Sequence, residues 1–253
     1  MNALKETKKK HLLAILKYLY LHNSSTMNEL VENLQLSQPS IRNMVRTLQE
    51  KQLIQEVGND LSSGGRCPTR FALNEKNYLI LCLYVQVDKV IYQLRNFNEI
   101  KKEGILFYQS EDELKKTIKD LIDQEKIHCC QIAVEGIVYE DVYVTDHHNV
   151  LEKHQWLKDI KKEINIPLQL QNDVKMIHQG CYFTYQQDST YYLYINEVGI
   201  GSSYFYKDEP LYGRSGIMGE IGLISLKGKT INQQIRECQN QEEFNEILSL
   251  LLS

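Results

Sequence analysis

Arginine and amide side chains gather on one stretch of the sequence where they could hold phosphates and read bases. Arg42, Asn43 and Arg46 are spaced to share one face of a helix. Three hydroxyl and amide side chains begin the same helix: Ser37, Gln38 and Ser40. A solvated helix face is served well by Glu and Lys, whereas Arg, Asn, Gln and Ser are the types that contact base edges and phosphates. These residues predict a nucleic-acid contact; the alternative is an ordinary solvated face.

A further cationic group follows in the stretch SSGGRCPTRFALN, residues 62–74. Gly64 and Gly65 let the backbone approach a ligand closely, and an arginine held beside them usually meets an anion. Arg66 could enter a minor groove or clamp a phosphate. We therefore expect Gly64, Gly65 and Arg66 to contact DNA, the alternative being a surface loop without a ligand.

Three amphipathic helices are expected to position these side chains. The first is predicted by apolar residues at helical spacing: Leu12, Ile15, Leu16 and Leu19. Thr26 and Glu29 have the spacing of a capping box, which begins the second helix. Ser37 is expected to cap the third helix, and Pro39 fits its first turn.

Two strands are expected after these helices. Leu53–Val57 and the alternating run Thr69–Leu73 are typical of strands, and a long polar loop separates them. Two helices with a short turn, then a strand, a loop and a strand, are the order of a winged helix-turn-helix, which we place at residues 1–75. A homodimer would set two copies of the third helix in successive major grooves.

The charge distribution agrees with a DNA-binding head. Residues 1–75 hold ten Lys/Arg and seven Asp/Glu, a net +3, whereas the remainder holds nineteen and twenty-six, a net −7.

No run of eighteen apolar residues is present, so no membrane segment is expected. Residues 1–10 lack the apolar core of a signal peptide, and the six cysteines show no C-x-x-C. We expect a cytoplasmic protein with reduced thiols.

The rest of the chain alternates between strand and helix patterns, which predicts an α/β fold. Strands are expected at 78–87, 90–97, 129–139 and 167–170, and from Tyr191 and Ser202. Helices are expected at 111–127 and 156–164, after Asp173, and near the C-terminus.

Several stretches resemble the ROK family of repressors, open reading frames and sugar kinases. They are GGRCPTRFALN, QWLKDIKKEINIPLQLQND and VGIGSSYFYKDEPLYGRSGIMGEIG, and the last, with its paired glycine loops, is the most specific. The resemblance extends to Gly222. It implies a winged helix-turn-helix joined to an actin-like, sugar-kinase-like body at 76–253, truncated relative to a typical member.

The resemblance implies a sugar site on Asn172, Asp173 and Glu220. In the family's kinases the aspartate is the general base for a sugar hydroxyl. Leu223 stands where the family has a histidine, and leucine cannot hydrogen-bond a hydroxyl. Asn172 and Asp173 could equally be a turn and a helix cap.

The phosphate side departs from the family pattern. A glycine-rich first hairpin is replaced by Tyr84–Asp88, and the second phosphate loop reads Glu197–Gly201, with a carboxylate where a small residue belongs. The family's zinc cysteines are missing after Gly222, so we expect neither a metal nor a nucleotide cofactor.

The sequence therefore predicts a transcription regulator, not an enzyme, that binds a double-stranded DNA operator as a homodimer. Its effector would be a sugar or a sugar phosphate, and repression of carbohydrate metabolism follows from the resemblance. Two alternatives stay open: a sugar kinase with a DNA-binding head, and a body that binds no ligand and serves dimerisation.

Overall fold

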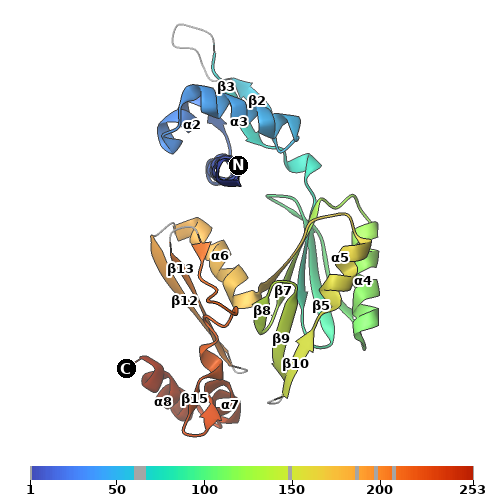
Figure 1. Ribbon diagram of the computed structural model, residues 1–253, viewed down its shortest axis with the longest axis vertical. Helices are drawn as coiled ribbons and strands as arrows, with labels where there is room; N and C mark the ends of the chain where they lie inside the picture. The colour runs from blue at the N-terminus through green and yellow to red at the C-terminus, as the bar shows by residue number, and fades with distance from the viewer. Residues whose placement is uncertain are drawn as a thin grey trace. The chain divides into compact units, whose positions relative to one another are not determined.

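The computed structural model describes residues 2–59, 67–147, 150–185, 188–196, 199–206 and 209–252. The chain divides into two compact units (Figure 1). The first comprises Met1–Ile80 and Leu94–Lys102, and the second comprises Leu81–Gln93 and Glu103–Ser253. None of the described helices is both long enough and apolar enough to cross a bilayer.

The first unit is built on three helices, as expected. They are α1 (Asn2–His22), α2 (Met27–Leu34) and α3 (Gln38–Glu50). Their apolar stripes share one core, to which α1 contributes Ile15 and Leu19. The other two helices add Leu30, Ile41, Met44, Val45 and Leu48. The periodicity in the sequence thus marked the buried faces of all three helices.

A three-stranded sheet completes this unit, with strand order β1-β3-β2. The strands are β1 (Ser25–Thr26), β2 (Ile54–Asn59) and β3 (Thr69–Leu73), followed by the 3₁₀ turn η1 (Glu75–Asn77). Strand β1, which the sequence did not predict, pairs with β3 through Ser25 and Phe71. Gly64, Gly65 and Arg66 lie outside the described residues.

Helix α2 begins at the expected capping box. The Thr26 hydroxyl accepts a hydrogen bond from the Glu29 amide at 3.3 Å, and the Glu29 carboxylate accepts one from the Thr26 amide at 2.8 Å. Helix α3 begins differently from the prediction. Ser37 is its N-cap residue, but its hydroxyl makes no capping hydrogen bond, so Pro39 rather than the serine side chain shapes the first turn.

Most of a five-stranded sheet with the order β11-β7-β4-β5-β6 belongs to the second unit, whereas Ile80 and the parts of β5 and β6 within 94–102 belong to the first. The strands are β4 (Ile80–Val85), β5 (Lys89–Arg95), β6 (Ile100–Phe107), β7 (Cys129–Val134) and β11 (Leu168–Asn172). Helices α4 (Glu111–Asp123) and α5 (Trp156–Glu163) pack together on one face of this sheet (Figure 1). Strands β7 and β11 are parallel, so their carboxyl ends meet at one edge.

The prediction of a single strand over residues 129–139 was wrong. The chain turns at Glu135 and Gly136 and continues as β8 (Ile137–Tyr139). Strand β8 belongs to a separate sheet of order β10-β9-β8, with β9 (Val142–His147) and β10 (Val150–His154). Gly136 has a φ of +95°, and a Cβ there would lie 2.2 Å from the Val144 carbonyl oxygen. The close approach requires glycine and explains the turn.

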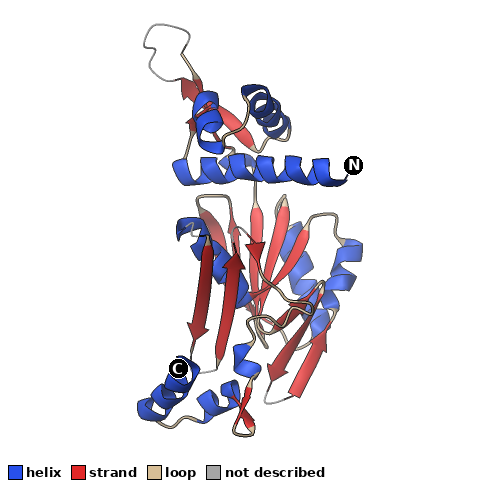
Figure 2. Cartoon of the chain, turned by 60° about the vertical axis from the view of Figure 1, so that its left-hand side comes forward, coloured by secondary structure: helices blue, strands red, loops and turns tan. Residues whose placement is uncertain are grey.

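The remaining elements begin with a helix and a small sheet, and the C-terminal helices lie beyond the end of that sheet (Figure 2). Helix α6 (Asp173–Tyr185) packs on a sheet of order β12-β13-β14, formed by β12 (Ser189–Ile195), β13 (Ile200–Tyr206) and β14 (Glu209–Pro210). The 3₁₀ turn η2 (Ile221–Leu223) and the hairpin β15 (Ser225–Leu226) and β16 (Lys229–Thr230) follow. The chain then forms α7 (Ile231–Glu237) and α8 (Gln241–Leu252). The buried core of this part is Ile200, Ile231, Ile235 and Ile247.

Candidate functional site

The outer face of α3 is the first candidate site. Arg42, Asn43 and Arg46 are exposed, while Ile41 and Met44 on the same helix are buried. The remaining predicted contacts lie at its start: Ser37 and Gln38 are exposed and Ser40 is half-buried. The structure therefore brings these predicted residues to one accessible surface.

An ion pair on this face involves Arg46. Its Nε lies 2.9 Å from Glu50 Oε1, and the two side chains are 79% and 61% exposed. An exposed i,i+4 pair is worth only about 0.3–0.5 kcal/mol, so a phosphate could compete for the guanidinium. Arg70 is different, because it ties β3 to α2 by hydrogen bonds to Glu29 and Ser24. We therefore assign Arg70 to the fold and not to the contact surface.

The second candidate site lies where β11 passes into α6. Asn172 is buried, its side-chain oxygen accepts a hydrogen bond from the Lys175 amide at 3.0 Å, and its amide nitrogen donates to the Gly136 carbonyl at 2.9 Å. Asn172 thus caps α6 and fixes the turn after β7. These are the contacts that the cap alternative predicted, and ligand binding by Asn172 stays a prediction.

Asp173 contacts Tyr84 of β4, which also bonds Glu135 at the turn after β7. The Tyr84 hydroxyl donates to Glu135 Oε1 at 2.8 Å and lies 3.3 Å from Asp173 Oδ2. Burial raises the pKa of Asp173 to about 6, with the Glu135 charge adding to the shift and the Val174 amide opposing it. Burial and the two carboxylates raise the pKa of Tyr84, which stays a neutral donor.

Glu220 and Lys175 form the other half of this site. Lys175 is 1% exposed, its Nζ donates to the Gly216 carbonyl at 3.1 Å, and it lies 3.8 Å from Glu220 Oε1. Burial raises the pKa of Glu220 to about 7, although the Lys175 charge opposes the shift. Burial likewise lowers the pKa of Lys175. Both shifts favour the neutral forms, because neither group is well solvated.

Two glycines bring Glu220 to this position. Gly216 has a φ of +76° and Gly219 a φ of +97°. A Cβ would lie 2.3 Å from the Val138 carbonyl oxygen at Gly216 and 2.0 Å from the Ser202 carbonyl oxygen at Gly219. No other residue could hold the loop this close to β8 and β13. The spacing of the glycines therefore determines where the carboxylate of Glu220 lies.

The family description "ROK family" matches residues 103–249, more than half of the chain. The chain belongs to the ROK family. A curated relative, the xylose repressor of Staphylococcus xylosus, is 24% identical over 229 residues. That alignment covers 82% of this chain and 58% of the repressor.

Solved ROK structures share the fold. The crystal structure of a ROK family transcriptional regulator, a homologue of the E. coli MLC protein, superposes with a TM-score of 0.68 at 17% identity. It covers 90% of this chain and 63% of that one. A putative sugar kinase from Cytophaga hutchinsonii superposes with a TM-score of 0.52 at 19% identity, covering 62% of this chain and 57% of the kinase. The chain thus spans about three fifths of the length of these relatives.

The two phosphate loops expected in ROK kinases are altered in this chain. In the first hairpin, the Tyr84 hydroxyl lies on the two carboxyl groups described above, and no glycine is present. In the second loop, the Ile200 amide donates to Asn232 Oδ1 at 2.8 Å, and the Gly199 amide donates to Asn196 Oδ1 at 3.0 Å. Amides that could hold a phosphate are instead bonded to protein side chains. Glu197 and Val198 lie outside the described residues.

Among the described residues, no group of three or more His, Cys, Asp or Glu could hold a metal ion. The described part beyond Gly222 offers Cys238, whose thiol donates to the Gln234 carbonyl.

Sequence reasoning missed Lys175 and Glu135. Periodicity places Lys175 on a helix but does not show that its ammonium group is buried. A signal for Glu135 did exist, because it is a carboxylate followed by glycine within the apolar run CCQIAVEGIVY. The structure places Glu135 exposed at the turn after β7, and a carboxylate at the end of a buried strand is a candidate for a site.

Proposed function

We propose that this chain is a DNA-binding transcription regulator, a repressor whose ROK body senses a sugar or a sugar phosphate and transfers no phosphoryl group. The observation that carries the proposal is the outer face of α3, where Arg42, Asn43 and Arg46 are exposed together. A helix with this composition suits a major groove.

The surrounding elements support a winged helix-turn-helix at residues 1–75. Helices α2 and α3 are joined by a short turn at Gln35, which has a φ of +53°. Strands β2 and β3 pair as a hairpin whose connecting loop contains the glycines and Arg66 of the predicted wing. The alternative, a three-helix bundle whose polar face binds no nucleic acid, does not account for the hairpin.

The relatives favour the same interpretation. One is a xylose repressor, and another is a ROK transcriptional regulator. A superposition over 90% of this chain must include part of residues 1–75. The shared region is therefore not the body alone.

The ligand site of the body is proposed at Asp173 and Glu220, with Asn172 positioning the turn. Lys175 adds a donor that the sequence did not reveal, and Leu223 removes the family's histidine. A sugar acting as effector must bind the DNA-competent and incompetent shapes with different affinity.

A sugar kinase is the rival function, because Asp173 and Glu220 are both present and a carboxyl with a pKa of about 6 can act as a base near neutral pH. The altered phosphate loops oppose it. Measurement of ADP release over a panel of hexoses decides between the two. Turnover that is lost in Asp173→Asn would overturn the proposal.

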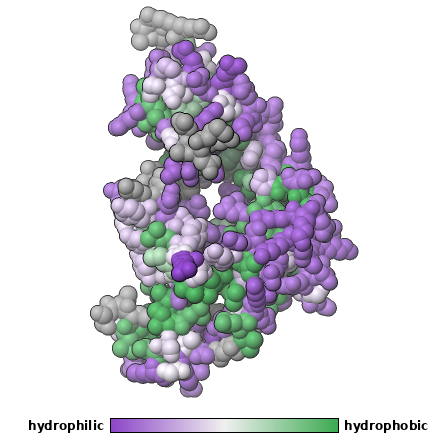
Figure 3. Space-filling model, viewed as in Figure 1, coloured by the Kyte–Doolittle hydropathy of each residue, from purple (hydrophilic) through white to green (hydrophobic). Residues whose placement is uncertain are grey.

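A homodimer is proposed as the DNA-binding state. Hydrophobic surface gathers in the lower part of Figure 3. The exposed apolar side chains of the second unit include Ile217, Ile224 and Leu250. Such patches commonly mark protein contacts. Light scattering gives the oligomeric state. A body that serves dimerisation alone would show no thermal stabilisation by any sugar or sugar phosphate.

The proposal is tested by selecting genomic fragments with the purified chain and sequencing them. We expect a small set of fragments with inverted repeats, released by one sugar or sugar phosphate from a panel. Enrichment of no sequence above background, at a salt concentration where the protein is folded, would contradict the proposal.

A further inference from the structure

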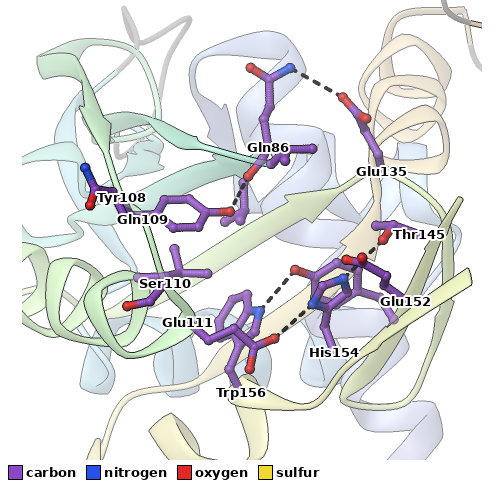
Figure 4. A pocket seen from close by; sticks show the side chains of 14 residues that line it. Gln86, Tyr108, Gln109, Ser110, Glu111, Glu135, Thr145, Glu152, His154 and Trp156 are labelled. Carbon is purple, nitrogen blue, oxygen red and sulfur yellow. Dashed lines mark hydrogen bonds and ion pairs between the residues drawn. The ribbon is translucent and has the colours of Figure 1, made fainter. Parts of the chain in front are cut away.

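A cavity of about 190 Å³ has Glu135, the neighbour of Asp173, in its wall (Figure 4). Its other walls come from the β4–β5 turn, the start of α4, and strands β9 and β10. The volume is below the ~300–1,000 Å³ of sites for drug-sized ligands, so the cavity suits a small molecule. All of its lining residues belong to the second unit.

The wall of the cavity is acidic. Glu111, Glu135 and Glu152 line it, and the described residues that line it include no lysine or arginine. In Figure 4 these three carboxylates stand on different sides of the hollow. They belong to no group that could hold a metal ion, because no such group occurs in the described residues.

Aromatic side chains share the apolar part of the lining with Val85, Val87 and Leu114. Trp156 and Tyr143 are buried, and the Trp156 Nε1 donates to the Tyr143 hydroxyl at 3.0 Å. Tyr108 lines the same cavity. Aromatic rings beside carboxylates are the surroundings in which amines and guanidinium groups bind, through the ring faces and charged hydrogen bonds.

His154 holds one of the carboxylates in place. Its Nδ1 lies 2.9 Å from Glu111 Oε1 and its Nε2 lies 3.1 Å from Thr145 Oγ1. The ring also stacks on Tyr143, with centroids 4.5 Å apart. Glu111 is thereby oriented by the protein, whereas no described hydrogen bond or ion pair involves the exposed Glu152 carboxylate.

We propose that this cavity binds a small organic cation, an amine or a guanidinium carried on a short apolar body. Glu152 and Glu135 Oε2 would accept hydrogen bonds from the ligand. The aromatic side chains that line the cavity would cover the apolar part of the ligand. An anion is disfavoured by the three carboxylates, and a neutral sugar would leave them without a counter-charge.

Glu135 would also connect this cavity to the proposed sugar site, an extension that rests on the proposed function. Its Oε1 accepts hydrogen bonds from Tyr84 at 2.8 Å and from Gln86 at 3.4 Å, and the same Tyr84 hydroxyl reaches Asp173. A cation beside Glu135 would offset its negative charge and so change how Asp173 binds a sugar hydroxyl. By linkage, each ligand would change the affinity of the other by the same factor.

Calorimetric titration of the full chain with agmatine, putrescine, glucosamine and glucose, at matched ionic strength, tests the cavity. We expect saturable binding of agmatine or putrescine, the two amines that are not sugars, independently of whether glucose binds at the proposed sugar site. Glu152→Gln should weaken the amine about three- to tenfold, whereas the exposed control Glu125→Gln should not. Equal weakening in both variants would show non-specific attraction to an acidic protein, and no saturable binding of agmatine or putrescine would show that the cavity takes no organic cation; either result overturns the proposal.

The link to the sugar site is tested separately, with the sugar affinity measured with and without saturating amine. We expect a shift that disappears in Glu135→Gln. Amine binding without any sugar binding would leave the cavity intact and contradict the proposed sugar site. If both ligands bind and neither changes the affinity of the other, only the proposed coupling between the two sites is contradicted.

Discussion

At the scale of single residues, Asp173 is a carboxyl held in an unfavourable environment. Burial raises its pKa from 3.8 to about 6, so between these values the folded chain binds more protons than the unfolded chain. Its contribution to stability is therefore present at low pH and is lost as the pH rises through 6. Above that pH the buried charge costs stability.

Asp173→Asn should remove this cost. We expect the variant to be more stable than the parent by about 1–2 kcal/mol at pH 8, after allowance for partial solvation, and by almost nothing at pH 4. Thermal unfolding at both pH values measures the difference. The exposed Asp120→Asn on α4 is the control, and an Asp173→Asn effect of equal size at pH 4 and pH 8 would contradict the pKa assignment.

The residues of the ligand site were only partly predictable. Asn172, Asp173 and Glu220 were found through the resemblance, but the resemblance did not show that the Asn172 side chain is engaged in a helix cap. Lys175 and Tyr84 enter the site through burial and through strand order. Neither property is visible in local sequence.

At the scale of elements, the helices were predictable and several strands were not. Helices α2, α3 and α4 each bury one stripe, and a period of 3.6 reveals it. Strand β6 was missed because it is almost wholly exposed and its sequence, IKKEGILF, does not alternate. The turn at Gly136 was missed because apolar residues continue on both sides of it.

The capping box of α2 is an element whose contribution can be measured. Thr26 is buried and both of its capping hydrogen bonds are formed. Thr26→Ala should lower the free energy of unfolding by about 1 kcal/mol. Thr47→Ala on α3 is the matched control, because the Thr47 hydroxyl bonds only the Asn43 carbonyl of its own helix. If urea unfolding gives an equal loss of unfolding free energy in the two variants, the capping box contributes no more to stability than the hydroxyl bond of Thr47.

The loop between β2 and β3 is predicted to act as a wing. Arg66→Ala should weaken binding to every DNA sequence and lower the slope of log affinity against log salt by about one for each phosphate that Arg66 neutralises. Titrations at several salt concentrations give the slope, and Lys153→Ala removes the same charge from the body as a control. An unchanged slope would exclude Arg66 from the interface.

At the scale of the whole molecule, two kinds of surface are joined in one chain. The first unit offers a cationic helix face. The second carries the proposed ligand site, and two of its loop amides, those of Gly199 and Ile200, are bonded to asparagine side chains. The division at residues 75 and 76, the homodimer and the sugar effector stay predictions. They follow from the family and from the order of the elements.

The outer face of α3 is tested most directly by DNA affinity. Fluorescence anisotropy with the selected fragment should show that Arg42→Ala combined with Arg46→Ala weakens binding at least about tenfold, while Lys153→Ala leaves it nearly unchanged. Circular dichroism shows whether the double variant keeps its fold. Full affinity in a folded double variant would contradict the assignment of this chain as a regulator that reads DNA through α3.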